Sequence, residues 1–299
     1  MLPKGSEAPA LELVLDAKAE IGEGPVWDDE TGELVWVDIA GGLVHRTTPG
    51  GVDRVLDVGR HVGSVGLRHR GGLVLATDDG FRLLDHGSNE TRLIAAVEAD
   101  SIGDTGTRMN DGWCDPAGRF WAGTMGYDKA PGRGALYRLD PDGTVTTVIR
   151  DVTISNGLDW AADDRTMYYI DTPTQALDAF DWDHDTGDLS NRRRIMEFPL
   201  AGGAPDGLTI DADGYLWIAF WGGWCIRRFT PGGEVVAEIR LPVSHVTSMA
   251  FGGSDLGDLY ITSAWSELSP SERTLEPLAG GLFRCRPGVL GRPVPRFEG

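Results

Sequence analysis

The feature that most constrains the fold is a unit that recurs six times along the chain. Each copy contains a short apolar strand, and these strands are Leu34–Val37, Leu73–Ala76, Phe120–Gly123, Met167–Ile170, Leu216–Ala219 and Leu259–Thr262. Their starts lie 39, 47, 47, 49 and 43 residues apart. Each apolar strand is preceded by one short strand and followed, after a loop marked by Gly or Pro, by another. Short strands repeated at this period are typical of a β-propeller.

The last unit indicates how the ring closes. A fourth strand ends most units, for example at 52–56, 144–149 and 234–239, but none follows Cys285. The N-terminal segment Leu11–Leu15 can supply the missing strand. We therefore expect an all-β fold, a six-bladed β-propeller with four-stranded blades whose ring is closed by an N-terminal strand. The sequence shows no helical period of useful length and no linker, so we expect a single domain over residues 1–299.

Equivalent positions in the six units predict a ring of polar residues. The strand nearest the axis of each blade lines the central channel, so one position per unit should fall at one level. Four residues before the end of the strand that precedes each apolar strand stand Glu23, Gly63, Asn110, Asn156, Asp206 and Thr247. Two carboxylates and two carboxamides at one level are hard oxygen donors, which suit a divalent cation such as Ca²⁺, Mg²⁺ or Mn²⁺.

A turn is the alternative explanation of these positions. Asn and Asp before Gly form turns through hydrogen bonds from their side chains to the backbone. Asn110-Asp111-Gly112, Asn156-Gly157 and Asp206-Gly207 fit that pattern. Glu23-Gly24 does not, because Glu does not form such turns. The residues alone leave both explanations open.

Two long loops should emerge on the same face as the ring. They are Thr124–Gly134 in the third unit and Ser263–Gly281 in the sixth. Loops of this length are often lids or substrate walls. Arg108, two residues before Asn110, should reach the same mouth, either to contact a ligand or simply to pair with the carboxylates.

Charge and cysteine content restrict the partners and the compartment. With 27 basic and 46 acidic residues the net charge is −19, which disfavours nucleic acid and membrane surfaces as partners, although it can equally serve solubility. There is no apolar run of ~18 residues to span a membrane and no apolar core of a signal peptide. Cys114, Cys225 and Cys285 lack CxxC spacing and are expected to be buried thiols. We expect a cytoplasmic protein, either a monomer or a weak homodimer.

Four motifs, in order, resemble the SMP-30/gluconolactonase/luciferin-regenerating-enzyme family. They are Ile21–Trp27 (IGEGPVW), Arg108–Met125 (RMNDGWCDPAGRFWAGTM), Ser155–Leu158 (SNGL), and Pro205–Leu208 (PDGL) with Gly214–Trp217 (GYLW). The resemblance runs from about Leu11 to Arg286. It implies a six-bladed propeller with divalent-metal-dependent lactonase activity, and this fold agrees with the one that the repeat predicts.

The resemblance also implies roles for particular residues. The metal ligands of the family fall on Glu23, Asn156 and Asp206, and its substrate-binding arginine and asparagine fall on Arg108 and Asn110. A substrate-binding glutamate of the family, in the loop after the Gly-Thr-Met motif, is replaced here by Asp128. Asp128 is one methylene shorter, which leaves the sugar specificity open.

The resulting hypothesis is hydrolysis of a gluconolactone-like sugar lactone to its aldonic acid, a reaction of carbohydrate metabolism. One divalent cation (Ca²⁺, Mn²⁺, Zn²⁺, Mg²⁺ or Fe²⁺) would polarise the lactone carbonyl, and Asp206 would be the general base. Two alternatives remain: a related hydrolase of other esters or phosphoesters, and a non-catalytic propeller that uses calcium as a structural ion.

Overall fold

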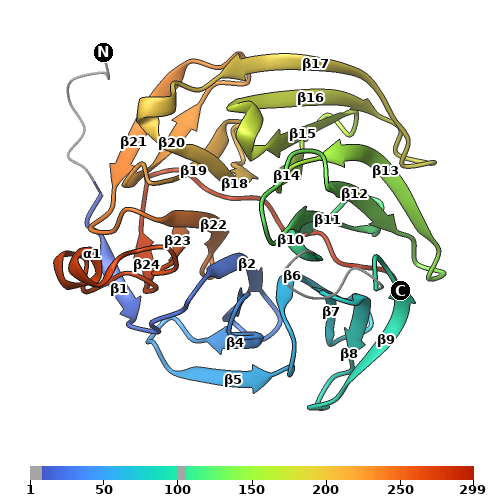
Figure 1. Cartoon of the computed structure of the whole chain (residues 1–299), viewed down its shortest axis with the longest axis horizontal. Helices are drawn as coiled ribbons and strands as arrows, with labels where there is room; N and C mark the ends of the chain where they lie inside the picture. The colour runs from blue at the N-terminus through green and yellow to red at the C-terminus, as the bar shows by residue number, and fades with distance from the viewer. Residues whose placement is uncertain (1–8, 100–105) are drawn as a thin grey trace.

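The computed structural model describes residues 9–99 and 106–299, which form a ring of six antiparallel four-stranded sheets (Figure 1). Blades 1 and 2 are β2 (Gly22–Asp28), β3 (Glu33–Asp38), β4 (Leu43–Thr47) and β5 (Asp53–Asp57), then β6 (Val62–Leu67), β7 (Leu73–Thr77), β8 (Gly80–Leu84) and β9 (Thr91–Ala96). Blades 3 and 4 are β10 (Thr107–Cys114), β11 (Phe120–Gly126), β12 (Gly134–Leu139) and β13 (Val145–Val152), then β14 (Ser155–Trp160), β15 (Thr166–Asp171), β16 (Ala176–Trp182) and β17 (Leu189–Glu197). The predicted six-bladed propeller is confirmed.

Blade 5 is regular, and blade 6 closes the ring. They are β18 (Ala204–Ile210), β19 (Leu216–Trp221), β20 (Cys225–Phe229) and β21 (Val235–Arg240), then β22 (Val246–Gly252), β23 (Asp258–Ser263), β24 (Leu282–Cys285) and β1 (Glu12–Leu15). In the antiparallel pairing of β1 with β24, Glu12 lies opposite Arg284 and Leu13 opposite Phe283. The N-terminal strand therefore completes the last blade, as predicted.

Residues 1–8, part of the segment in which no signal-peptide core was expected, lie outside the described residues. Within 9–99 and 106–299, no helix is long and apolar enough to cross a bilayer. The three cysteines are free and buried, as predicted.

The core lies between neighbouring blades. Strands β3 and β7 are buried along their whole length, whereas the outer strands β5 and β9 are largely exposed. A strand that is covered on both faces reads as a continuous apolar run rather than an alternating one. Between blades 3 and 4, Trp121 meets Trp160 edge to face at 5.4 Å between ring centroids. This double burial is why the second strand of each blade dominates the repeat in the sequence.

Every innermost strand carries a β-bulge at the level of the polar ring. The pairing register shifts between Glu23 and Val26 in β2, between Met109 and Gly112 in β10, and between Pro205 and Leu208 in β18, with corresponding shifts in β6, β14 and β22. A bulge leaves a residue unpaired and redirects its side chain. Six bulges at one level therefore turn a set of side chains toward the channel.

The loop between β23 and β24 contains the one α-helix of the described residues, α1 (Pro270–Leu275), beside two 3₁₀ turns elsewhere at Thr172–Thr174 and Leu200–Gly202. Ser269 caps α1: its side chain accepts a hydrogen bond from the Glu272 backbone N–H, and the Glu272 side chain accepts one from the Ser269 N–H. Ser269-Pro270-Ser271-Glu272 is a capping-box pattern, so the sequence carried a signal for this helix.

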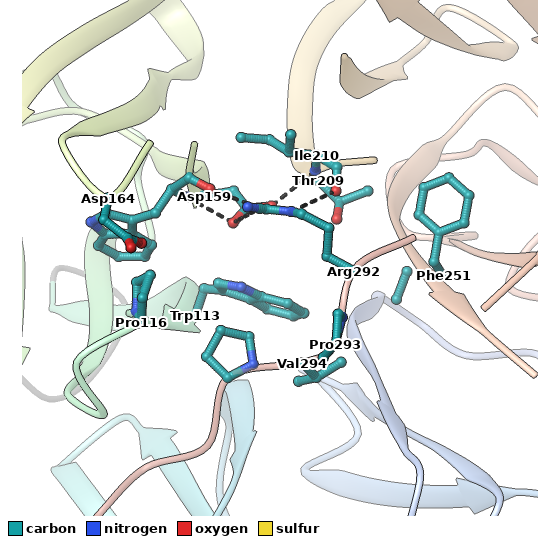
Figure 2. A pocket seen from close by; sticks show the side chains of 13 residues that line it. Trp113, Pro116, Asp159, Asp164, Thr209, Ile210, Phe251, Arg292, Pro293 and Val294 are labelled. Atoms are coloured by element: carbon teal, nitrogen blue, oxygen red, sulfur yellow. Dashed lines mark hydrogen bonds and ion pairs between the residues drawn. The ribbon is translucent and has the colours of Figure 1, made fainter. Parts of the chain in front are cut away.

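The C-terminal tail crosses the end of the channel opposite the polar ring, where Arg292 reaches the carboxyl ends of β14 and β18 (Figure 2). Arg292 extends from the tail and donates to the Asp159 carboxylate at 3.1 Å and to the Trp160 carbonyl at 2.7 Å. Further along the tail, Phe297 is buried, and its N–H donates to the Leu67 carbonyl. Between the tail and the blades lies a cavity of about 240 Å³, lined in part by Trp113, Phe251 and Pro293.

Candidate metal and substrate site

A cavity of about 170 Å³ lies where the innermost strands begin, at the mouth of the channel. Its lining contains five of the predicted site residues: Glu23, Arg108, Asn110, Asn156 and Asp206. They come from four different strands, β2, β10, β14 and β18, so only the closed ring brings them together.

The three predicted metal ligands are mutually close. The side chains of Asn156 and Glu23 are near enough to the Asp206 carboxyl to lower its pKa. All three residues are buried, between 4% and 6% exposed. Within the described residues, Asn156 Oδ1 is buried without a hydrogen-bond partner, while Asn156 Nδ2 donates to Thr172 Oγ1 at 2.8 Å. The amide is thus held by its nitrogen with its oxygen left unused.

Burial and neighbouring acidic groups disfavour the charged forms of the two ligand carboxyls. Burial, followed by the charges of Asp206 and Asp111, raises the pKa of Glu23 well above its ordinary value, although the Gly24 N–H and Arg108 oppose this. Burial and then Asp111 likewise raise the pKa of Asp206. Both carboxyls could be ionised if a bound cation offset their charge.

These residues fit a divalent cation. The donor set is two carboxylates and one unpartnered carboxamide oxygen, all hard oxygen ligands. Among the described residues no group of three or more His, Cys, Asp and Glu side chains is arranged to hold a metal. A cation here would therefore depend on the Asn156 oxygen as well as on the carboxylates.

The turn interpretation is wrong for the three ligands. Glu23, Asn156 and Asp206 lie within strands, at the bulges described above. Asp111 also lies within a strand, β10, and its Oδ1 accepts a hydrogen bond from the Gly112 N–H at 2.8 Å, as Glu23 Oε2 accepts one from the Gly24 N–H at 2.9 Å.

Asp111 is a residue that the sequence interpretation missed. It is 8% exposed, burial raises its pKa to about 6, and its charge contributes to the raised pKa values of Glu23 and Asp206. It adds a third acidic group to the same electrostatic environment. The sequence signal was present in Asn110-Asp111-Gly112, but counting along the repeat selected Asn110 as the ring position.

Arg108 and Asn110 form one unit beside the ligands. Arg108 Nη1 donates to Asn110 Oδ1 at 2.7 Å and to the Met109 carbonyl at 3.0 Å, and Asn110 Nδ2 donates to the Ser155 carbonyl at 2.7 Å. Burial lowers the pKa of Arg108, while Tyr127 and the carboxylates Glu23 and Asp206 raise it. Within the described residues the recorded hydrogen bonds of this guanidinium use Nη1, so Nε and Nη2 can serve a ligand.

The other two ring positions contribute no side chain to the cavity lining. Gly63 has none, and Thr247 uses its hydroxyl to donate to the Gly22 carbonyl at 2.6 Å. The sequence placed six positions on one level, but four of them line the cavity.

Asp128 lies on the predicted loop but outside the cavity lining. Its carboxylate is 41% exposed and accepts hydrogen bonds from Arg133 at 2.9 Å and from the Ala130 N–H at 3.1 Å. Its neighbour Lys129 lines the cavity instead, together with Glu267 of the long loop in blade 6. A substrate contact by Asp128 stays a prediction.

Comparison with known proteins places this geometry in a family. Residues 21–265 match the model of the SMP-30/Gluconolactonase/LRE-like region. YvrE of Bacillus subtilis, a candidate sugar lactone lactonase, is 38% identical over 286 residues, which cover 95% of this chain and 97% of YvrE. The crystal structure of regucalcin from Agrobacterium tumefaciens, a calcium-binding protein, matches with a TM-score of 0.92 at 29% identity over 97% of this chain and 98% of that one. A luciferin-regenerating enzyme matches with a TM-score of 0.89 at 32% identity over 97% and 100% of the two chains. The chain belongs to the SMP-30/gluconolactonase/LRE-like family.

Proposed function

We propose that this chain hydrolyses a gluconolactone-like sugar lactone to the aldonic acid, with one divalent cation held by Glu23, Asn156 and Asp206. The observation that supports this most is the convergence of those three side chains with Arg108 and Asn110 on one cavity. The similarity to YvrE, a candidate sugar lactone lactonase, supports the same activity.

The residues around the cavity have separate tasks in this reaction. A bound cation supplies Lewis-acid polarisation of the lactone carbonyl. Arg108, with Nε and Nη2 unused, donates hydrogen bonds to substrate hydroxyls, and Asn110 fixes the guanidinium through its Oδ1. Asp206, whose carboxylate lines the cavity, takes a proton from the water that attacks the carbonyl carbon. The ring C–O bond then breaks, and the proton passes to the leaving hydroxyl.

Replacing Asp206 with Asn tests this proposal. We expect the variant to lose turnover of sugar lactones, because it removes both a metal ligand and the proton acceptor. A matched control is Asp213→Asn, which neutralises an exposed carboxylate at the β18–β19 turn. Near-normal lactone hydrolysis by the Asp206→Asn variant would contradict the proposal.

The metal and the lactone can be identified in one screen. Chelated enzyme is supplied with Ca²⁺, Mn²⁺, Zn²⁺, Mg²⁺ or Fe²⁺ one at a time, and a pH indicator reports acid release from a panel of five- and six-carbon sugar lactones. We expect turnover with at least one metal and none after chelation.

A second candidate function is a calcium-binding scaffold without catalysis. It is favoured by the structural likeness to regucalcin from Agrobacterium tumefaciens, a calcium-binding protein. A scaffold predicts that Ca²⁺ raises the melting temperature while no lactone is hydrolysed under any metal. Comparing rates on sugar lactones, aryl esters and organophosphates separates the lactonase from a related hydrolase of other esters or phosphoesters.

We also propose that the protein acts in the cytoplasm as a monomer or weak homodimer on neutral small molecules. Its net charge of −19 and its three buried thiols support this. Light scattering over a range of concentrations tests the oligomeric state, and fractionation of the producing cells tests the compartment.

A further inference from the structure

An ion pair links two loops from opposite sides of the ring. Lys129 Nζ pairs with Glu267 Oε1. Lys129 lies between β11 and β12 of blade 3, and Glu267 lies between β23 and β24 of blade 6. Blades 3 and 6 are diametrically opposite in a ring of six, as Figure 1 shows. The pair therefore reaches across the ring.

The pair also belongs to the cavity that holds the candidate site. Lys129 and Glu267 both line it, together with the ligands Glu23, Asn156 and Asp206. The charge of Glu267 reaches Arg108, since it is among the groups that raise the pKa of that guanidinium. The ion pair thus lies over the site rather than on a distant part of the surface.

Each loop holds its charged residue in place independently of the ion pair. Lys129 and Glu267 both adopt left-handed backbone conformations, with φ of 54° and 68°. Non-glycine residues keep this conformation when their surroundings impose it. On one side the Lys129 N–H donates to the Gly126 carbonyl at 2.9 Å, and on the other the Ser266 N–H donates to the Glu20 carbonyl at 3.0 Å.

The blade 6 loop has further anchors that do not involve Glu267. His245 Nδ1 hydrogen-bonds the Ser266 carbonyl at 2.9 Å, and the His245 ring stacks on Trp221 at 4.0 Å. The buried Glu276 carboxylate accepts the Ser244 N–H at 2.6 Å. Breaking the ion pair therefore leaves both loops folded and frees only the two side chains.

The ion pair between Lys129 and Glu267 is weak because both side chains are exposed to solvent. Both side chains are 49% exposed, and ion pairs of that exposure contribute little stability and are weakened by salt. We propose that Lys129 and Glu267 form a gate across the mouth of the channel, closed by their ion pair and opened when a ligand enters or leaves.

The gate also bears on substrate size, a consequence that rests on the proposed function. With the pair closed, Lys129 and Glu267 form part of the lining of a cavity of about 170 Å³. With the pair broken, both side chains can swing outward and admit a bulkier ester. Lys129 and Glu267 would then select single sugar lactones over larger esters.

A cysteine placed in the cavity lining can report opening of the gate in an assay that needs no metal, substrate or turnover. Met125 lines the cavity, is 4% exposed, and lies opposite Arg108 in the pairing of β10 with β11. The three native cysteines are buried and provide little background. In a Met125→Cys background, the rate of alkylation by the neutral reagent iodoacetamide measures how often the mouth is open.

Breaking the pair should speed this alkylation. In the Met125→Cys background, we expect Lys129→Met and Glu267→Gln each to raise the rate by up to about five-fold, the range of exposed ion pairs. The double exchange Lys129→Glu with Glu267→Lys should restore the slow rate, because it rebuilds the pair with its charges reversed. Raising NaCl from 0.05 M to 1 M should accelerate the protein with an intact pair and leave the Lys129→Met variant unchanged.

Two controls make the result specific. Leu200→Cys places a thiol at a residue that is 81% exposed, and its alkylation rate should not respond to the gate variants. Arg286→Met breaks an ion pair of similar exposure with Asp255, away from the cavity, and should leave the Met125→Cys rate unchanged. Equal alkylation rates in the intact, broken and exchanged pairs would overturn the gate. That outcome is independent of whether the protein hydrolyses lactones.

Discussion

Two residues of the polar ring, Glu23 and Asp206, should lower the stability of the metal-free protein and bind a divalent cation. Glu23 and Asp206 are both buried, and burial together with nearby acidic charges, Asp206 and Asp111 for Glu23 and Asp111 for Asp206, raises the free energy of their charged forms. Two buried carboxylates destabilise the metal-free fold, whereas a bound cation would offset their negative charge. Glu23 and Asp206 should therefore destabilise the protein without metal and stabilise the protein with metal bound.

The substitution Glu23→Gln tests whether this carboxyl has opposite effects on stability without and with metal. At pH 8 we expect the variant to be more stable than the parent protein without metal, by about 1–2 kcal/mol, because one buried charge is removed. We also expect divalent cations to raise its melting temperature much less than that of the parent. Calorimetry with and without chelator measures both effects, and Glu234→Gln, a change in the β20–β21 turn, is the control. A Glu23→Gln variant that is less stable without metal would contradict this account.

At the scale of elements, the innermost strands lie unusually close to one another. A side chain at Gly157 would meet the backbone of the next blade, since a Cβ there would be 2.6 Å from the Leu208 nitrogen and 2.7 Å from the Asp206 carbonyl oxygen. Gly63 stands in the same relation to β10, where its Cβ would be 2.4 Å from the Met109 carbonyl carbon. Small residues at these points let the bulged strands converge and bring the ligands of separate blades together.

Gly157→Ala should push β18 away from β14. We expect a loss of about 1–3 kcal/mol in unfolding free energy, the usual effect of overpacking, and weaker binding of a divalent cation because Asp206 moves with β18. Gly232→Ala is a matched control, as the nearest atom to its Cβ would be 3.8 Å away. Denaturant unfolding measures the stability, and metal titration measures the cation affinity. A normal metal affinity in a destabilised Gly157→Ala variant would contradict the view that this close packing positions Asp206.

The repeated innermost strands and the unrepeated loops differ in how well the sequence could predict their site residues. Glu23, Asn110, Asn156 and Asp206 were found by counting, because each sits at the same bulge of a repeated strand. Lys129 and Glu267 have no equivalent in the other blades, and their contact joins loops 138 positions apart. Asp111 was missed because counting along the repeat selected Asn110 as the ring position. Repetition makes positions predictable, whereas contacts made once require the three-dimensional structure.

For the whole molecule, ring closure involves both ends of the described chain. β1 completes blade 6, while the C-terminal tail joins all six blades at the far end of the channel. Its backbone and arginines hydrogen-bond Asp28 in blade 1, Leu67 in blade 2, Gly118 in blade 3, Asp159 in blade 4, Ala212 in blade 5 and Leu256 in blade 6. A segment that contacts every blade opposes the separation of any two of them, so it should stabilise the closed ring.

Phe297 provides the cleanest test of this role. It is 1% exposed and packs among Val74, Phe120 and Leu139 of blades 2 and 3, so Phe297→Ala should cost about 3–5 kcal/mol. We expect a melting temperature lower by on the order of 10 °C, and a larger loss when residues 287–299 are removed. Leu200→Ala, at an exposed apolar residue, should change little. Because the tail lies at the opposite end of the innermost strands from the metal ligands, the Phe297→Ala protein should keep its divalent-cation affinity at low temperature. Weakened cation binding in that variant would instead mean that the tail positions the site itself.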